Sequence, residues 1–504
     1  EGAFPPPPPL DPFFPVGADD PLERREHQRE AERQAFLTAL AAGDGGMVVL
    51  SAPDSSGGRP TFPSRWLLEA AGDLAGRPLD ASAFLTLRPA ANPWLRVVRS
   101  VLHGVLTAPS PADLEDRRLG EAAAHRRSGG RLGDHALARR ADLPLGDGLR
   151  VHGLRSSAAF TEVDGNVAAI AASARSLRRI FEGTRPISPT PIERWASCPF
   201  RYFLGRVLDV EPTKPPEESW TINPLDRGSL VHDVLEAFFR TLGQEGRPGP
   251  GEPYRPEDFA LIERLAEAQF VRVEDRGLTG HPFAWENARA AVLADLRGLL
   301  LADQAWRVEQ GLVPARFEQE FGLRDDAWPA LALAADGAQL RFGGKIDRID
   351  LDPVRRRAFV YDYKTGRGDD YEKVADDPVL AGRHLQLALY TRAVRANLGS
   401  DYAVEGAYWF VTSRGGFKRH ALPDDPARVD ARLDEAVDLI ARGVRGGLFP
   451  QAPGEADRGS FKNCRHCDFD RVCPAGRDDH WQEKQADPGY AFYRRLAEPG
   501  GEKA

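Results

Sequence analysis

The chain contains 504 residues, 42% of them hydrophobic and 28% charged, and carries a formal net charge of −8. That length is too great for one ordinary hydrophobic core, so two or three domains are expected, and the hydrophobic share excludes a disordered chain. The negative total neither indicates nor excludes nucleic-acid binding, because binding depends on local patches and an acidic metal site lowers the sum.

The four cysteines are too few for a disulfide scaffold in so long a chain. They favour a reducing, cytoplasmic location, where clustered thiols usually bind metal. No apolar run reaches the length of a membrane span and no signal sequence opens the chain, so we expect no membrane partner. The chain begins with Glu1 and its only methionine is Met47, which indicates an excerpt from a longer polypeptide.

The first 108 residues divide into two predicted parts. Residues 1–21 are rich in proline and read as an extended linker. Residues 22–108 are expected to hold a charged helix up to about Ala42, a buried strand at Met47–Ser51 and a helix that begins after the N-cap Ser64. Strand, loop and helix in this order predict an α/β unit.

Two further regions follow. Residues 109–186, rich in Arg, Ala and Gly, are predicted to be a helical connector. Residues 187–504 are expected to form a separate domain, which begins with a helix capped by Ser188 or Thr190 and carrying Cys198. Its other predicted elements are helices at 228–242, within 256–310, at 382–397 and at 428–444, and strands at 339–351, 357–363 and 404–412.

A carboxylate-lysine pattern lies on the two central predicted strands. Side chains alternate along a strand, so Asp362 and Lys364 point one way, and Tyr361 and Tyr363 point the other way, into the packed side. Asp347 lies late on the preceding strand, and we expect the two strands to form a hairpin. Two carboxylates can hold Mg²⁺ or Mn²⁺, which prefer hard oxygen ligands, and the lysine can orient a water or neutralise developing charge.

Three more residues are candidates for this site. His232 lies on the helix predicted at 228–242 and can complete a metal shell, although a lone helical histidine is more often a packed or surface residue. Gln386 and Tyr390 share one face of the helix that follows Lys364 and can position a phosphate or the lysine. By itself, this pair also fits an ordinary helix surface.

Four segments occur in a fixed order: GSLVH at Gly228–His232, GKIDRID at Gly344–Asp350, DYKTG at Asp362–Gly366 and LQLALY at Leu385–Tyr390. Together they resemble the motifs of the RecB-family branch of the PD-(D/E)XK nucleases, over about Ser188 to Gly476. The resemblance implies an α/β, restriction-endonuclease-like core with helical additions. It implies metal binding by His232, Asp347, Asp362 and the carbonyl of Tyr363, and catalytic roles for Asp347, Asp362, Lys364, Gln386 and Tyr390.

The cysteines fall at Cys198 and, near the end of the chain, at Cys464, Cys467 and Cys473. From the spacing alone, four thiolates can hold either a structural zinc ion or an iron–sulfur cluster. A distant cysteine in a Cys-Pro-Phe-x-Tyr-Phe setting, followed by Cys-x2-Cys-x5-Cys past the core, resembles the iron–sulfur staple of AddB-type nucleases. That resemblance implies a 4Fe-4S cluster on the four cysteines.

The N-terminal part is similar, over a shorter stretch, to the end of the second RecA-like domain in UvrD-class helicase-nucleases. The segments that carry this resemblance are Val48–Ser51 and Pro63–Leu68. An unrelated α/β platform is the alternative. The sequence contains no phosphate-loop pattern, so the chain alone is not expected to hydrolyse ATP, and any motor would lie upstream of it.

Taken together, the sequence predicts a metal-dependent deoxyribonuclease that acts as the C-terminal part of a DNA repair and recombination helicase-nuclease. We expect exonuclease action on DNA, most readily on single strands, and a second helicase-nuclease subunit as partner. One alternative is a catalytically inactive DNA-binding or scaffold module of such a complex. Another is a zinc-stapled nuclease that acts on RNA or another phosphodiester.

Overall fold

The computed structural model describes residues 21–497, except for 43–45, 54, 57–58, 109, 172–176, 178–184, 212–219, 400, 458 and 475. Nearly all of the predicted linker therefore lies outside the described residues. The chain divides into two compact units, Glu1–Gly146 and Asp147–Ala504. This boundary falls inside the connector predicted at 109–186.

The second half of that connector belongs to the second unit because it packs on the C-terminal segment. Lys484, at the end of α16 (Arg477–Lys484), is only 1% exposed and donates to the carbonyls of Leu154, Ser157 and Ala159 at 3.1, 2.7 and 2.8 Å. A buried ammonium needs such partners, because an unpaired charge is costly to bury. These bonds tie the end of α6 (Leu145–Arg155) to the tail of the chain.

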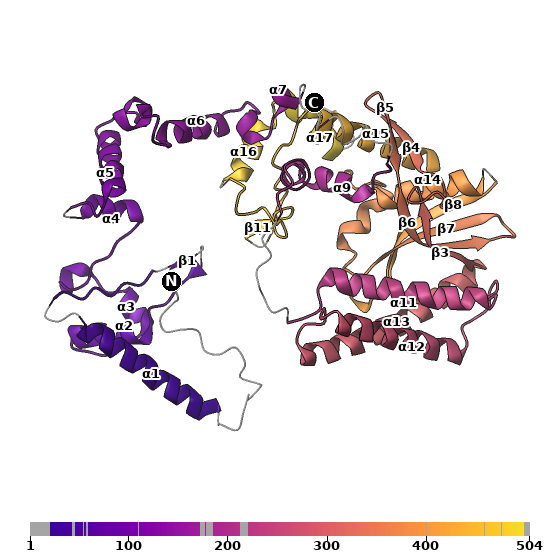
Figure 1. The fold of residues 1–504 in the computed structure, drawn as a ribbon, viewed down its shortest axis with the longest axis horizontal. Helices are drawn as coiled ribbons and strands as arrows, with labels where there is room; N and C mark the ends of the chain where they lie inside the picture. The colour runs from indigo at the N-terminus through magenta and orange to yellow at the C-terminus, as the bar shows by residue number, and fades with distance from the viewer. Residues whose placement is uncertain are drawn as a thin grey trace. The chain divides into compact units, whose positions relative to one another are not determined.

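The described part of the first unit is mainly helical (Figure 1). Its helices are α1 (Pro21–Ala41), α2 (Arg65–Ala75), α3 (Ala81–Leu85), α4 (Val101–Thr107) and α5 (Leu114–Arg127), and its only sheet among the described residues is the ribbon of β1 (Ser55–Ser56) and β2 (Arg59–Pro60). Ser64 caps α2 as predicted, because its hydroxyl accepts a hydrogen bond from the Leu67 amide.

The prediction of a buried strand at Met47–Ser51 is wrong. These residues have no ladder partner within the described part of the chain, and Met47 and Val49 are 88% and 73% exposed. An apolar run is a local signal, whereas a strand is stabilised by neighbours on either side, which this segment lacks. The likeness of this region to a helicase domain remains a prediction.

The second unit is built on a five-stranded sheet in the order β3-β6-β7-β8-β9. Its strands are β3 (Val313–Phe321), β6 (Gly344–Asp352), β7 (Arg357–Lys364), β8 (Ala403–Phe410) and β9 (Arg419–Ala421). The β6–β7 hairpin is antiparallel as predicted, and β7 and β8 are parallel. A parallel pair needs a crossover, which α14 (Gln386–Leu398) supplies.

The strand predicted at 339–351 is divided in two at Gly343. Its first part, β5 (Ala338–Phe342), pairs with β4 (Leu331–Ala335) in a separate hairpin, and its second part is β6. A Cβ at Gly343 would lie 3.1 Å from the Phe321 carbonyl oxygen, so the glycine permits a close approach at the break. The split places Asp347 within a strand that starts only three residues earlier.

Helices cover both faces of the sheet (Figure 1). One hydrophobic core joins α11 (Pro224–Gln244), α12 (Pro256–Asp275) and α13 (Pro282–Gln310) to Phe359, Tyr361 and Tyr363 of β7. The other joins α9 (Pro189–Ser197), α14, α15 (Pro426–Arg445) and α17 (Ala491–Ala497) to the alternate β7 residues Ala358 and Val360. The predicted inward direction of both tyrosines is confirmed, and the opposite face is packed as well.

The remaining elements of the second unit are short. They are η4 (Glu162–Asp164), α7 (Ala168–Ala171), α10 (Pro199–Tyr202), η5 (Phe203–Val207), η6 (Asp369–Ala375), η7 (Ser413–Gly415), β10 (Ala456–Asp457), β11 (Ser460–Phe461) and η8 (Pro488–Tyr490). Within the described parts of both units, no helix combines the length and hydropathy needed to cross a membrane.

Candidate active site and cysteine cluster

Three carboxylates lie in one row across the strands β3, β6 and β7. The β3–β6 register pairs Phe317 with Arg348 and Gln319 with Ile346, so Glu318 faces Asp347 between these pairs. The β6–β7 ladder ends at the pair Arg348–Tyr361, and the next position along it brings Asp347 opposite Asp362. A row of acids across neighbouring strands concentrates negative charge and favours a bound cation.

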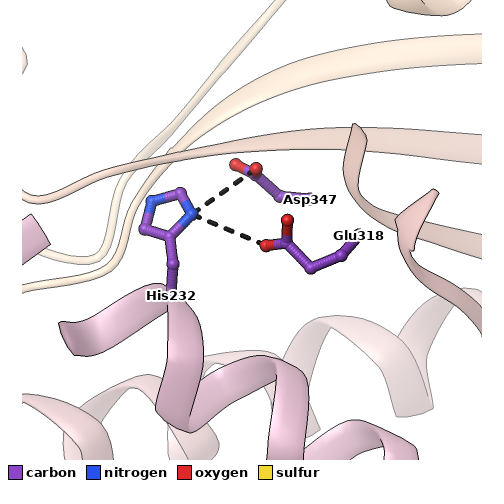
Figure 2. A group of neighbouring side chains, drawn as sticks. All are labelled: His232, Glu318 and Asp347. Atoms are coloured by element: carbon purple, nitrogen blue, oxygen red, sulfur yellow. Dashed lines mark ion pairs between the residues drawn. The ribbon is translucent and has the colours of Figure 1, made fainter. Parts of the chain in front are cut away.

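A histidine from outside the sheet completes this cluster. His232 lies on α11, whose first turn is capped by Asn223 and begins with Pro224. Figure 2 shows its Nδ1 directed at two carboxylates, with Asp347 Oδ1 at 3.4 Å and Glu318 Oε1 at 3.9 Å. One donor atom from each of these three residues lies within 4.8 Å of the others. The structure thus brings together a nitrogen and two oxygens around one position.

Electrostatics of this cluster favour positive charge. Burial lowers the pKa of His232, but Asp347 and then Glu318 outweigh it and raise that pKa to about 10. On the other side of Glu318, its second oxygen pairs with Lys345 Nζ at 2.6 Å. The imidazole and the ammonium therefore neutralise an acidic site to which a divalent cation is also suited.

Sequence reasoning did not find Glu318. It precedes Asp347 by 29 positions in a strand that the sequence pattern did not predict, and only the pairing of β3 with β6 brings it to the site. Its backbone has φ of 49°, in the left-handed region that non-glycine residues seldom adopt. Such a conformation at a side chain aimed into a site is the kind of local strain that functional positions retain.

Asp362 and Lys364 lie at the end of β7, beside the cluster of His232, Glu318 and Asp347. Lys364 Nζ forms an ion pair with Asp362 and donates to Gln386 Oε1 at 3.2 Å. Burial lowers the pKa of Lys364, but Asp362 outweighs it and the net shift is upward. Burial raises the pKa of Asp362, and Lys364 opposes that rise. Of the two roles that the sequence left open for Gln386, toward a phosphate or toward the lysine, the structure contains the contact with the lysine.

The two predicted tyrosines have different positions. The amide of Tyr363 donates to Asp347 Oδ2 at 2.6 Å, which joins β7 to β6 where the ladder has ended. Tyr390 is buried on α14 with its ring edge-on to Phe321. A Cβ at Gly344 would lie 3.2 Å from Tyr390 Cε1, so the glycine in the GKIDRID segment makes room for this ring.

A buried ion network supports the β6 strand next to Asp347. Arg348 is 1% exposed and pairs with Asp303 of α13 and with Asp350, both at 2.6 Å. Its guanidinium also lies over the Phe239 ring at 4.2 Å. These partners fix the strand against the helices, because each buried charge is matched by an opposite one.

All four cysteines are free and partly buried. Cys198 is the C-cap of α9 and not part of the helix, and the other three follow β11. Burial raises the pKa of Cys464 to about 11, and Cys198, Cys473 and Cys467 each add to that rise. Burial, and to a smaller extent Cys473 and Cys467, also raise the pKa of Cys198. The fold therefore brings the distant cysteine to the C-terminal three.

A mixed sheet with a carboxylate row, a lysine two residues after the last acid and helices on both faces has the layout of the restriction-endonuclease-like core expected from the sequence. Residues 186–474 match the model of the PD-(D/E)XK nuclease superfamily, and the chain belongs to this superfamily. Nucleases of this superfamily use divalent metal ions, and the cluster of His232, Glu318 and Asp347 is a candidate acidic site for one.

Similar curated proteins share one name, which describes each as the same subunit of an "ATP-dependent helicase/deoxyribonuclease". The chain is 29% identical over 238 residues to the relative from Symbiobacterium thermophilum, and this alignment covers 44% of the chain and 18% of the relative. It is 26% identical over 242 residues to the relative from Alkaliphilus metalliredigens. It is 23% identical over 244 residues to the relative from Thermoanaerobacter sp. (strain X514). Each of these two alignments covers 46% of the chain and 20% of the relative. The matched region thus spans no more than a fifth of each of these relatives.

A solved structure, "Crystal structure of SSO0001", aligns with 55% of the chain and 94% of its own length at 16% identity. Its TM-score is 0.20.

Proposed function

We propose that this chain hydrolyses DNA phosphodiesters as the nuclease part of a helicase-nuclease. The observation that carries the proposal is the row Glu318, Asp347 and Asp362, with His232 and Lys364 on either side of it. The shared name of the relatives supports DNA as the substrate.

The donor set suits a hard divalent cation. His232, Glu318 and Asp347 would hold it, with Asp362 and the Tyr363 carbonyl as further ligands, and Mg²⁺ or Mn²⁺ fits these mainly oxygen donors. Such an ion supplies Lewis acidity toward the phosphate and lowers the pKa of a bound water.

The protein's own groups orient the reaction. Lys364, held between Asp362 and Gln386, would position the attacking water or neutralise charge on the phosphate. Tyr390, close to the same acids, would support this arrangement from α14. Asp347 is fixed by the Tyr363 amide, so the site needs little reorganisation before the chemical step.

The cysteine cluster is proposed to hold a 4Fe-4S centre on Cys198, Cys464, Cys467 and Cys473. Support comes from the donor set of four free thiols, in which Cys473 and Cys467 raise the pKa of both Cys198 and Cys464. Cys198 and Cys464 are 266 residues apart in the chain, as are Ser197 and Asn463, which directly precede them and are joined by a hydrogen bond. Closing so long a loop removes about 5 kcal/mol of unfolded-state entropy by analogy with a disulfide.

The remaining assignments rest on the family resemblance and the cysteine usage, and the word "subunit" in the relatives' name supports only the partner. We propose exonuclease action on single strands, a partner subunit that completes the helicase-nuclease, and a cytoplasmic location. The region 22–108 is proposed to be the end of a RecA-like helicase domain whose motor lies upstream.

The test is cleavage of end-labelled single- and double-stranded DNA by the purified chain, with Mg²⁺, with Mn²⁺ and with excess chelator. The proposal expects metal-dependent cleavage, faster on single strands, that the chelator abolishes. DNA binding without cleavage under all metal conditions would favour the inactive scaffold module instead.

A further inference from the structure

The first turn of α14 is capped by a residue from another helix. The first amide groups of a helix have no partner within it, and the N-cap Leu385 has no polar side chain to offer. Instead Glu193 of α9 accepts hydrogen bonds at one carboxylate oxygen from the amides of Leu385 and Gln386, at 2.7 and 3.1 Å. These contacts join positions that are 192 and 193 residues apart in the chain.

The capped residue is the one that holds the lysine of the candidate active site. Gln386 Oε1 accepts from Lys364 Nζ at 3.2 Å, and Lys364 pairs with Asp362. The charges of Lys364 and Asp362 both shift the pKa of Glu193. Burial raises its pKa to about 7, the Leu385 amide and Lys364 act to lower it, and Asp362 adds to the rise. One residue therefore separates the Glu193 carboxylate from Lys364.

The helix that carries Glu193 is itself firmly held. Trp195 is fully buried, with its ring 5.6 Å from that of Phe492 and 5.8 Å from that of Tyr493. The Tyr493 hydroxyl donates to the Ala196 carbonyl at 2.9 Å, and the side-chain Nδ2 of Asn463 donates to the Ser197 carbonyl at 2.8 Å. The C-terminal half of α9 is thus fixed from several sides, so the helix can serve as a rigid support.

We propose that Glu193 is a positioning residue for hydrolysis, which fixes the start of α14 and thereby holds Gln386 where it orients Lys364. This inference rests on the proposed nuclease function. It also joins the two clusters of the domain, because α9 presents Glu193 to the active site and ends at Cys198, one of the four cysteines. Misplacing a reacting group by about 1 Å costs on the order of 10²-fold in rate, so a cap that sets its position affects catalysis directly.

The test compares Glu193→Ala and Glu193→Gln in the full chain by steady-state cleavage of labelled single-stranded DNA. Glu193→Ala leaves both amides without an acceptor, and kcat should fall about tenfold or more while KM and the Mg²⁺ concentration for half-maximal rate stay within about twofold. Glu193→Gln retains an acceptor oxygen, and its kcat should stay within about threefold of the wild-type value.

The matched control is Asp438→Ala. Asp438 of α15 also accepts a backbone N–H, from Asp336 at 2.8 Å, but it lies outside the candidate site. Its loss should lower stability without the selective fall in kcat. If Glu193→Ala changes kcat no more than Asp438→Ala does, or if Glu193→Gln is as slow as Glu193→Ala, the positioning role is wrong.

Amide hydrogen exchange separates this inference from the proposed function. Glu193→Ala should speed exchange at Leu385 and Gln386, whereas Glu193→Gln and Asp438→Ala should not. Unchanged exchange at both amides in Glu193→Ala would overturn the inference even with an active enzyme. If the wild-type chain cleaves no DNA, the proposed function fails, and the exchange result still decides whether Glu193 fixes the start of α14.

Discussion

Asp347 joins the two strands of the site through its side chain, because its Oδ2 accepts a 2.6 Å hydrogen bond from the Tyr363 amide. The backbone ladder between β6 and β7 has ended one position earlier, at Arg348 and Tyr361. The carboxylate takes the place of the next backbone hydrogen bond of the ladder. Its other oxygen, Oδ1, lies 3.4 Å from His232 Nδ1. One residue therefore maintains the sheet and presents an oxygen to the metal position, which fixes the site before a substrate arrives.

Glu318 should be required for metal affinity. Glu318→Gln removes one charged donor of the three-residue cluster, and we expect the Mg²⁺ concentration for half-maximal cleavage to rise about tenfold or more. The measurement is cleavage rate against Mg²⁺ concentration. Glu320→Gln is the control, because Glu320 lies two residues further along β3 and pairs with Arg324 outside the cluster. Equal half-saturation in both variants would remove Glu318 from the ligand set.

Arg348 should contribute strongly to stability. Arg348→Met leaves Asp350 buried without its cation and leaves Asp303 with only the more distant Arg307, which costs about 3–5 kcal/mol. Chemical denaturation of the variant measures this loss. Arg324→Met breaks the ion pair of a mostly exposed arginine and should cost less than about 1 kcal/mol. Similar losses in the two variants would contradict the structural role assigned to the buried network.

His384 should make the folded chain sensitive to mild acid. Its ring lies 4.4 Å from that of Tyr371, and burial, followed by Lys364, lowers its pKa to about 4. In the unfolded chain this imidazole takes up a proton near pH 6.5, whereas in the folded chain it stays neutral until about pH 4. Protonation between these two pH values therefore favours the unfolded state, and the free energy of unfolding falls as the pH drops through this window. Unfolding free energies at pH 7.5 and 5 measure the effect.

The comparison for this effect is His384→Gln. Between those two pH values the free energy of unfolding of the wild-type chain should fall by about 1–2 kcal/mol more than that of the variant. Only the wild-type chain has an imidazole at this position whose pKa differs between the folded and the unfolded state. A loss of the same size in both proteins would show that another group is responsible for the acid sensitivity.

Cys467→Ser should remove the cluster proposed on the four cysteines. Protein prepared without oxygen should be brown and contain iron, and the variant should lose the broad visible absorbance and melt at a lower temperature. Val472→Ala, a change at a 67% exposed position of the same segment, should keep the colour. Colourless wild-type protein with stoichiometric zinc would contradict the iron–sulfur proposal and support a zinc staple.

Local patterns predicted most of the second unit. Alternation on β7 gave the directions of Tyr361 and Tyr363, and helical spacing gave the helix of His232. Glu318 and Glu193 have no such local signal. The first reaches the site through strand pairing and the second through a contact across 192 residues, so neither role can be read from neighbouring residues. The wrong prediction of a strand at Met47–Ser51 has the same cause, because this apolar run has no partner strand among the residues that the structure describes.

The most direct test of the account is metal-dependent cleavage by Asp362→Ala and Lys364→Ala, with Asp401→Ala as control. Asp401 pairs with Arg356 on the surface, away from the carboxylate row, and its loss should leave the rate unchanged. Each active-site change should lower the rate of Mg²⁺-dependent DNA cleavage by about 10²-fold or more while the variants remain folded. Full cleavage by either variant would contradict the assignment of this site.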